Sequence, residues 1–186
     1  ALNVSGTGTL SAVAASNLAA TKAIKVTESA GLNLTGATLT NLTSVDTTGT
    51  TGATTLTIDS TKTTYAGGAG VDTVTFSNTT AAAKALDLGA GDDTLTLNGT
   101  VVAPTATLKG GDGTDTIGMT GASAESLSAN STFAGKIEGF EKLYINDKVA
   151  AATTVNMANM DGMHAQGAAP AAMSTAMVDG AVKKIG

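Results

Sequence analysis

The sequence lacks several residue types on which compact enzymes and nucleic-acid-binding proteins usually depend. Its 186 residues include no cysteine, no tryptophan and no arginine, and only three phenylalanines, two tyrosines and one histidine. A core built on large aromatic rings is therefore excluded. Disulfides are excluded too, which fits either a fold that needs no covalent link or a secreted protein stabilised by metal. Burial must come from many small aliphatic and β-branched side chains, which suits the repeated layers of a solenoid.

Basic residues are also scarce. The chain carries 15 acidic residues against 10 lysines, a net charge of −5, and six of its 11 aspartates lie between Asp72 and Asp115. Because no basic patch is available to displace counterions, nucleic acid is disfavoured as a partner. The local acidity favours divalent cations. No apolar run approaches the ~20 residues of a membrane span, so we expect none in this chain.

Three glycine-rich turns recur in the middle of the chain, at residues 67–72, 88–93 and 110–115. Each ends in an aspartate that is followed by threonine and an apolar residue, which matches the nonapeptide G-G-x-G-x-D-x-U-x of calcium-binding β-solenoids. The fourth residues of these turns continue a wider series with intervals of 21, 18, 21 and 22: Gly31, Gly52, Gly70, Gly91 and Gly113. A period near 20 predicts one supersecondary unit per repeat, stacked on its neighbours.

Alternating threonine and apolar residues flank each turn, which is typical of half-buried strands. We therefore predict an all-β fold, a right-handed parallel β-solenoid with about 20 residues per coil. Residues 1–186 would form a single domain or fragment, with degenerate coils over 1–63, calcium-binding coils over 64–119 and continuing coils over 120–186. Within the last part we expect a short helix near 123–128 capped by Ser123, strands at 153–157 and 180–185, and a Met-rich loop at 160–177.

The glycine turns suit Ca²⁺, which takes about six to eight oxygen ligands and accepts main-chain carbonyls. Glycine allows successive carbonyls to point inward, and two stacked turns together can complete a coordination shell. We expect one ion between turns 67–72 and 88–93 and a second between 88–93 and 110–115, with Asp72, Asp93 and Asp115 as the side-chain ligands. The candidate metal-binding residues are Gly67, Ala69, Asp72, Leu88, Ala90, Gly91, Asp93, Gly110, Asp112, Gly113 and Asp115. One such turn could be ordinary hairpin punctuation, but three in phase favour calcium.

Two other patterns are better explained by structure than by function. Threonine pairs at 55 and 57, 73 and 75, and 94 and 96 resemble the arrays of ice-binding solenoids, but threonine is also a good exposed strand residue. The methionines around His164 could bind a soft metal, although methionine more often fills a core or an interface. One histidine, no arginine and no suitable Ser-His-Asp spacing give no support to catalysis. We therefore expect no enzyme.

The repeats at about residues 64–119 resemble those of RTX proteins, which are exported bacterial calcium-binding proteins. The Thr-, Ala- and Gly-rich composition and the segment from Ile137 to Leu143 look like RTX-type surface-layer proteins. This resemblance implies a parallel β-roll that folds on external calcium, type I secretion, a location on the bacterial cell surface and self-association into a two-dimensional lattice. A cell-surface polysaccharide, contacted through another region, is a further candidate partner.

The chain departs from the family pattern in two ways. Family repeats often follow one another directly in 18-residue coils, whereas Gly70, Gly91 and Gly113 are 21 and 22 residues apart, and Leu88 stands where the pattern has glycine. These departures affect how many ions the turns can bind. Two other functions stay open: an RTX adhesin or ice-binding module, and the calcium-binding appendage of a secreted enzyme.

Overall fold

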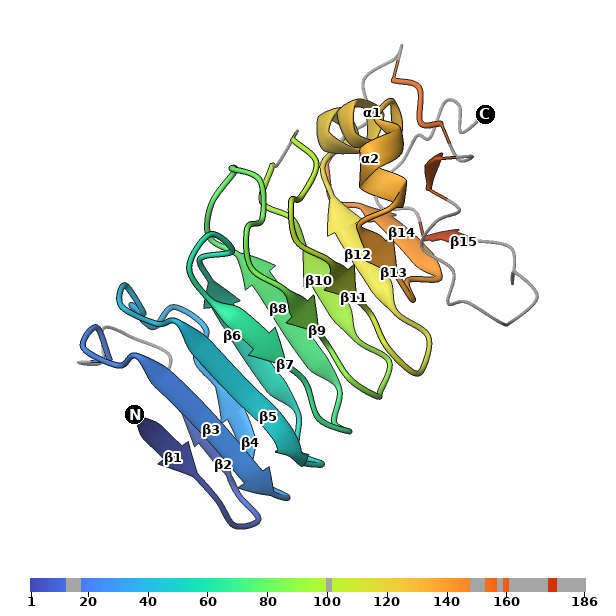
Figure 1. Ribbon diagram of the computed structural model, residues 1–186. Helices are drawn as coiled ribbons and strands as arrows, with labels where there is room; N and C mark the ends of the chain where they lie inside the picture. Colours follow the sequence, from blue (N-terminus) through green and yellow to red (C-terminus); the bar gives the residue numbers. More distant parts are fainter. Residues whose placement is uncertain (13–17, 100–101, 148–152, 157–158, 161–173, 177–186) are drawn as a thin grey trace.

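A computed structural model describes residues 1–12, 18–99, 102–147, 153–156, 159–160 and 174–176. The chain forms a β-solenoid of two parallel sheets (Figure 1). One sheet has the order β1-β3-β5-β7-β9-β11-β13 and the other the order β15-β14-β12-β10-β8-β6-β4-β2. Strands of the first sheet are β1 Leu2–Val4, β3 Ala23–Glu28, β5 Ser44–Thr50, β7 Thr64–Ala66, β9 Leu86–Asp87, β11 Leu108–Lys109 and β13 Ile137–Glu138. Strands of the second are β2 Thr9–Ser11, β4 Gly31–Asn33, β6 Thr54–Ile58, β8 Asp72–Phe76, β10 Thr94–Thr96, β12 Thr116–Met119, β14 Lys142–Ile145 and β15 Ser174–Ala176.

Each coil consists of a strand in the first sheet, a tight turn, a strand in the second sheet and a longer return loop. The tight turns lie along one edge of the stack and the return loops along the other (Figure 1). All three glycine-rich segments form tight turns, between β7 and β8, β9 and β10, and β11 and β12. The predicted parallel β-solenoid is therefore confirmed, and the glycine turns are stacked on one side of it.

The core consists of columns of equivalent residues, one from each coil, as the alternating sequence pattern predicts. Adjacent strands are about 4.8 Å apart, so each buried side chain packs on the equivalent one above and below. One inward column from the second sheet contains Leu34, Leu56, Val74, Leu95, Ile117 and Leu143. The facing column from the first sheet contains Ile24, Val45, Tyr65, Leu86, Leu108 and Ile137. Small aliphatic residues thus build the core, with single aromatic rings inserted.

The strand register shows that Gly31, the first glycine of the series, does not lie level with Gly52 in the next coil. Pairing of Leu32 with Thr54 places Ala30, not Gly31, at the level of Gly52. A β-carbon added at Gly52 would overlap the carbonyl group of Ala30. Leu34 is consequently level with Leu56, and Gly31 lies one residue beyond the position that matches Gly52. Periodicity of the apolar residues was a better guide to register here than the glycine itself.

Two short helices follow β12: the predicted helix near 123–128 is confirmed, and a second helix was not predicted. Helix α1 spans Gly121–Ser128, and its cap is Thr120, whose hydroxyl accepts the Ser123 N–H at 3.1 Å. Ser123 therefore lies inside the helix and is buried. A second helix, α2 Ser131–Ala134, is capped by Asn130 and buries Phe133. Both helices cover the return-loop side at the C-terminal end of the stack (Figure 1).

The C-terminal segment differs from its prediction where it is described. Ser174–Ala176 forms β15, which pairs with β14, although this stretch was expected to be a loop. Residues 153–156 form no strand, contrary to expectation, while residues 161–173 and the predicted strand at 180–185 lie outside the described part. Pairing with a neighbouring strand decides the conformation of such short segments, and composition does not report it.

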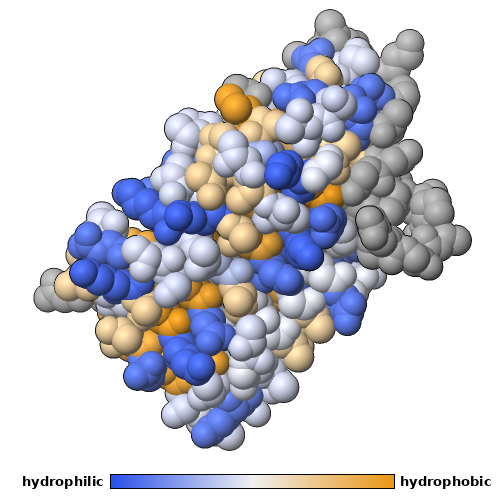
Figure 2. Space-filling view, in the orientation of Figure 1, coloured by the Kyte–Doolittle hydropathy of each residue, from blue (hydrophilic) through white to orange (hydrophobic). Residues whose placement is uncertain are grey.

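The N-terminal end of the stack leaves part of its core open to solvent. Leu10 is 37% exposed, and Leu2 and Val4 are only partly buried. Figure 2 shows hydrophobic residues among the hydrophilic ones over these first coils. Within the described part of the chain, no helix is long and apolar enough to span a membrane.

Candidate cation site

The three motif aspartates lie directly above one another, one per coil, and point into the solenoid. Strand pairing places Thr54, Asp72, Asp93 and Asp115 in one column of the second sheet. All three aspartates are buried, with no more than 1% exposed. The column continues to Glu141, because Thr116 pairs with Lys142 in the next coil. In the N-terminal coils the same position holds Leu32 and Thr54, so the column has no carboxylate there.

Each carboxylate reaches back to the main chain of the preceding coil. Asp72 Oδ1 accepts the N–H of Thr54 at 3.1 Å, and Asp93 Oδ1 accepts the N–H of Asp72 at 2.7 Å. Asp115 Oδ1 accepts the N–H of Asp93 at 2.8 Å, and Glu141 Oε2 accepts the N–H of Asp115 at 2.7 Å. Hydrogen bonds from N–H groups to ionised carboxylates are shorter and stronger than neutral ones. This carboxylate ladder therefore ties five successive coils together.

The three aspartates differ in whether their second carboxylate oxygen has a hydrogen-bond partner. Asp72 Oδ2 accepts a hydrogen bond from the Tyr65 hydroxyl at 2.7 Å, so both of its oxygens are engaged. Asp93 Oδ2 and Asp115 Oδ2 are buried and have no hydrogen-bond partner. A buried polar atom without a partner loses its hydration, which costs about 1–3 kcal/mol and more when the group is charged. Two carboxylate oxygens in this column thus lack a partner, and a bound cation would provide one.

Burial raises the pKa of all three aspartates. The pKa rises from 3.8 to about 6 for Asp72 and Asp93, and to about 7 for Asp115. Desolvation is the largest cause in each case. The nearby charges of Asp93, Glu141 and Asp92 raise the pKa of Asp115 further. Desolvation and the Asp72 charge raise the pKa of Tyr65 well above 10.0, so its hydroxyl stays protonated as the donor.

The glycine turns approach one another so closely that side chains are excluded. A β-carbon added at Gly113 would overlap the carbonyl oxygen of Gly91, and one added at Gly91 would lie 3.0 Å from the carbonyl oxygen of Gly70. Gly91 and Gly113 also have positive φ angles of 138° and 142°, which are strained for residues with a side chain. The motif glycines therefore place main-chain carbonyls of successive turns against one another.

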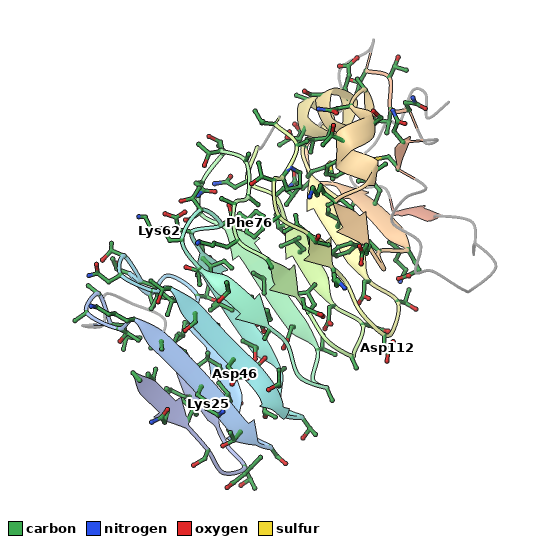
Figure 3. The ribbon with its side chains drawn as sticks, viewed as in Figure 1. Lys25, Asp46, Lys62, Phe76 and Asp112 are labelled. Carbon is green, nitrogen blue, oxygen red and sulfur yellow. The ribbon has the colours of Figure 1, made fainter. Side chains whose placement is uncertain are left out.

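Some main-chain groups of the turns already bond to the neighbouring coil. Ala90 forms an isolated parallel bridge with Asp112. The carbonyl oxygens of Gly68, Gly89 and Asp112 accept N–H groups at 2.8 Å from Ala90, Asp112 and Gly91, respectively. Of the predicted ligands, the Asp112 carbonyl is thus engaged. Its side chain is exposed at the turn edge of the stack (Figure 3).

A column of the first sheet faces the carboxylates across the turn. Its register continues through Thr47, Gly67, Leu88, Gly110 and Gly139. Leu88 is fully buried. Glycine stands at this position in the coils before and after it, where an added β-carbon would overlap the carbonyl oxygen of the next coil. A β-carbon added at Gly110 would overlap the carbonyl oxygen of Gly139 and lie 2.7 Å from Asp115 Oδ2.

The structure brings all eleven predicted metal-binding residues into one set of stacked turns. Glycine-turn carbonyls and buried carboxylates are the oxygen donors that Ca²⁺ prefers, and the two unpartnered carboxylate oxygens fit a bound cation. Among the described residues, no three His, Cys, Asp or Glu side chains converge on one point. A cation here would consequently need main-chain oxygens in its shell. Sequence reasoning missed two members of the site, Tyr65 and Glu141.

No lysine neutralises the carboxylate column in the described part of the chain. The ion pairs that the structure contains join Lys25 to Asp46, Lys62 to Asp59 and Lys109 to Glu138, at 3.0–3.3 Å. Lys25 and Asp46 lie on the outer surface of neighbouring strands, far along the stack from Asp112 (Figure 3). Among the described residues, the buried acidic column therefore has no countercharge.

Comparison of the chain with protein-family models, with curated proteins and with solved structures finds no match.

Proposed function

We propose that this chain is a calcium-dependent structural segment of an RTX-type bacterial surface-layer protein. The observation that carries the proposal is the buried carboxylate column beneath stacked glycine turns. Asp93 Oδ2 and Asp115 Oδ2 have no partner there, and lysine countercharge is lacking among the described residues. The N-terminal coils stack with Leu32 and Thr54 at the equivalent positions, so stacking alone does not require a buried carboxylate there.

Calcium binding would couple to folding through these carboxylates. In the ion-free chain, burial raises the pKa of the three aspartates to about 6 or 7, so holding these carboxylates ionised and buried at neutral pH costs folding free energy. Bound Ca²⁺ supplies positive charge that offsets this cost. Asp93, Asp115 and the carbonyls of the stacked turns would hold it. Because the site exists only when successive coils are stacked, binding free energy contributes to folding free energy.

This coupling suits a protein that is exported before it folds. Cytosolic free calcium is low and external calcium is high, so the coils would order outside the cell, as expected for type I secretion. The regular rows of threonine on the outer face of the second sheet suit side-by-side self-association into a two-dimensional lattice. In this proposal the chain has no catalytic role.

The experiment that tests calcium-dependent folding is circular dichroism with thermal unfolding, in EDTA and in millimolar calcium. We expect more strand signal and a higher melting temperature with calcium, because a ligand that binds only the folded state stabilises it. The matched control is a variant with asparagine at positions 72, 93 and 115, which keeps the side-chain shapes. This variant should respond little to calcium. Identical spectra and melting temperatures of the natural chain in both buffers would refute the proposal.

Lattice formation has a separate test. Electron microscopy of the purified chain should show ordered two-dimensional sheets in calcium and none in EDTA. A chain that binds calcium and folds but remains monomeric at all concentrations would support a binding module or an enzyme appendage over a lattice protein.

A second candidate function, ice binding, rests on the outer face of the second sheet. Thr55, Thr73, Thr94 and Thr116 pair in register, and so do Thr57, Thr75 and Thr96. The result is a regular two-column array of hydroxyls, interrupted at Gly118 in the next coil. A thermal-hysteresis assay decides this point. Activity that Thr73→Tyr abolishes would favour ice binding, and no activity at high protein concentration would exclude it.

A further inference from the structure

The last tight turn of the stack continues the carboxylate column with a different residue. Glu141 accepts the N–H of Asp115 at 2.7 Å, in the way that Asp115 accepts the N–H of Asp93. It follows Gly139 by two residues, as Asp115 follows Gly113 and Asp93 follows Gly91. Three residues separate β13 from β14, whereas six separate β11 from β12, so this turn is shorter than the one it stacks on.

The main chain at Gly110 and Gly139 packs directly against the Asp115 side chain. The two glycines are neighbours in the inward column of the first sheet, and both are buried. A β-carbon at Gly110 would overlap the Gly139 carbonyl oxygen and would lie 2.7 Å from Asp115 Oδ2. The Gly139 carbonyl oxygen and the unpartnered carboxylate oxygen of Asp115 therefore lie close to each other beside Gly110.

In the two preceding coils, protein side chains lie beside the carboxylate or at the register position of Gly110. In the coil of Asp72, the Tyr65 hydroxyl bonds to Asp72 Oδ2 at 2.7 Å. In the coil of Asp93, Leu88 stands at the register position of Gly110, and its side chain is fully buried. Between the turns at 110–115 and 139–141, by contrast, glycine stands at both register positions, and the Asp115 carboxylate oxygen lies close to the Gly139 carbonyl oxygen.

We propose that the strongest Ca²⁺ site of this chain lies between turns 110–115 and 139–141. Asp115, Glu141 and the Gly139 carbonyl supply its ligands, and Tyr65 replaces the ion at Asp72. This inference rests on the proposed calcium function and relocates its principal site. The sequence motif alone places one ion between turns 67–72 and 88–93 and the other between turns 88–93 and 110–115. In the relocated site a residue outside the motif, Glu141, becomes a ligand.

The test compares two single charge removals at opposite ends of the carboxylate ladder. Glu141→Gln removes a negative ligand but keeps an oxygen that can accept the Asp115 N–H. Asp72→Asn is the matched control, since it removes the same charge from a carboxylate whose oxygens are both engaged by protein. Calcium is titrated into each full-length chain by isothermal calorimetry, and circular dichroism verifies that each variant is folded.

The strongest site of Glu141→Gln should bind calcium about tenfold more weakly or worse, because calcium affinity depends on the number of charged ligands. Asp72→Asn should keep the affinity of the natural chain. If Glu141→Gln binds calcium as tightly as the natural chain, or if Asp72→Asn is the variant that loses affinity, the relocated site is wrong while calcium binding stands. If the natural chain binds no calcium, the proposed function fails together with this inference.

Should Glu141→Gln not fold, Leu88→Gly offers a second test. Removing the Leu88 side chain beside Asp93 should add one bound ion, and an unchanged number of bound ions would contradict the inference.

Discussion

Replacing Asp115 with asparagine should stabilise the chain in the absence of calcium at pH 8. The Asp115 carboxylate is fully buried, its Oδ2 has no partner, and burial together with the charges of Asp93, Glu141 and Asp92 raises its pKa to about 7. Asparagine keeps an oxygen that can accept the N–H of Asp93 and carries no charge. The substitution therefore removes the penalty of ionising a buried group.

The magnitude follows from the pKa difference between the folded and unfolded states. A rise from 3.8 to about 7 corresponds to about 4 kcal/mol lost from the free energy of unfolding once the carboxylate is ionised. Asparagine introduces a buried NH₂ group that needs its own acceptor, which costs about 1–3 kcal/mol. We expect a net gain of at least about 1 kcal/mol at pH 8.

The gain should depend on pH in a defined direction. Because the folded pKa is raised, the folded state holds a proton that the unfolded state has released between pH 3.8 and about 7. The stability of the natural chain therefore falls as pH rises through this range and stays low above it. The advantage of Asp115→Asn should thus be largest at pH 8 and should shrink or reverse at pH 5.

Urea unfolding in EDTA, followed by circular dichroism at pH 5 and pH 8, measures both quantities. The same experiment with millimolar calcium should reverse the order at pH 8, because the natural chain gains a ligand that the variant binds less well. The reasoning is refuted if Asp115→Asn is less stable than the natural chain in EDTA at pH 8, or if its advantage does not vary with pH.

Three further substitutions test the packing around the site, each by urea unfolding at a fixed calcium concentration. Tyr65→Phe removes the hydroxyl that bonds Asp72 Oδ2 and should cost about 1–3 kcal/mol; no loss would mean that this bond contributes nothing. Gly113→Ala places a β-carbon on the Gly91 carbonyl oxygen at a positive φ and should cost more than about 2 kcal/mol. Its control is Gly8→Ala, which should be nearly neutral because no atom lies within 4 Å of the added β-carbon. Equal effects of the two substitutions would contradict the close stacking of the turns. Phe76→Ala empties a buried column position and should cost about 3–5 kcal/mol, and a loss below about 1 kcal/mol would show that the core is not packed as described.

The general fold could be predicted from the sequence because a solenoid repeats its physical constraints in every coil. Alternation of threonine with Leu, Val or Ile reports which side of a strand is buried, and the glycine turns mark where each coil changes sheet. Local capping was less predictable: α1 begins after Thr120 and not at Ser123. Both residues can cap a helix, and the difference is decided by where β12 ends.

The candidate site could be located from the sequence but not resolved into its contacts. The motif identified Asp72, Asp93 and Asp115, and the register confirms that they share one column. Tyr65 could not have been assigned, because its contact with Asp72 crosses the interior between the two sheets. Glu141 lies 26 residues beyond Asp115 because α1 and α2 intervene, which broke the expected period. The signal that identifies it is glycine two residues before an acidic residue, shared with every coil of the ladder.

The most direct measurement of the central claim is a crystal structure of the chain grown in calcium, with anomalous differences recorded at a wavelength where calcium scatters anomalously. The account predicts a calcium peak among the stacked turns, strongest between Asp115, Glu141 and the Gly139 carbonyl. A well-ordered map with no calcium peak beside Asp93 or Asp115 would contradict it.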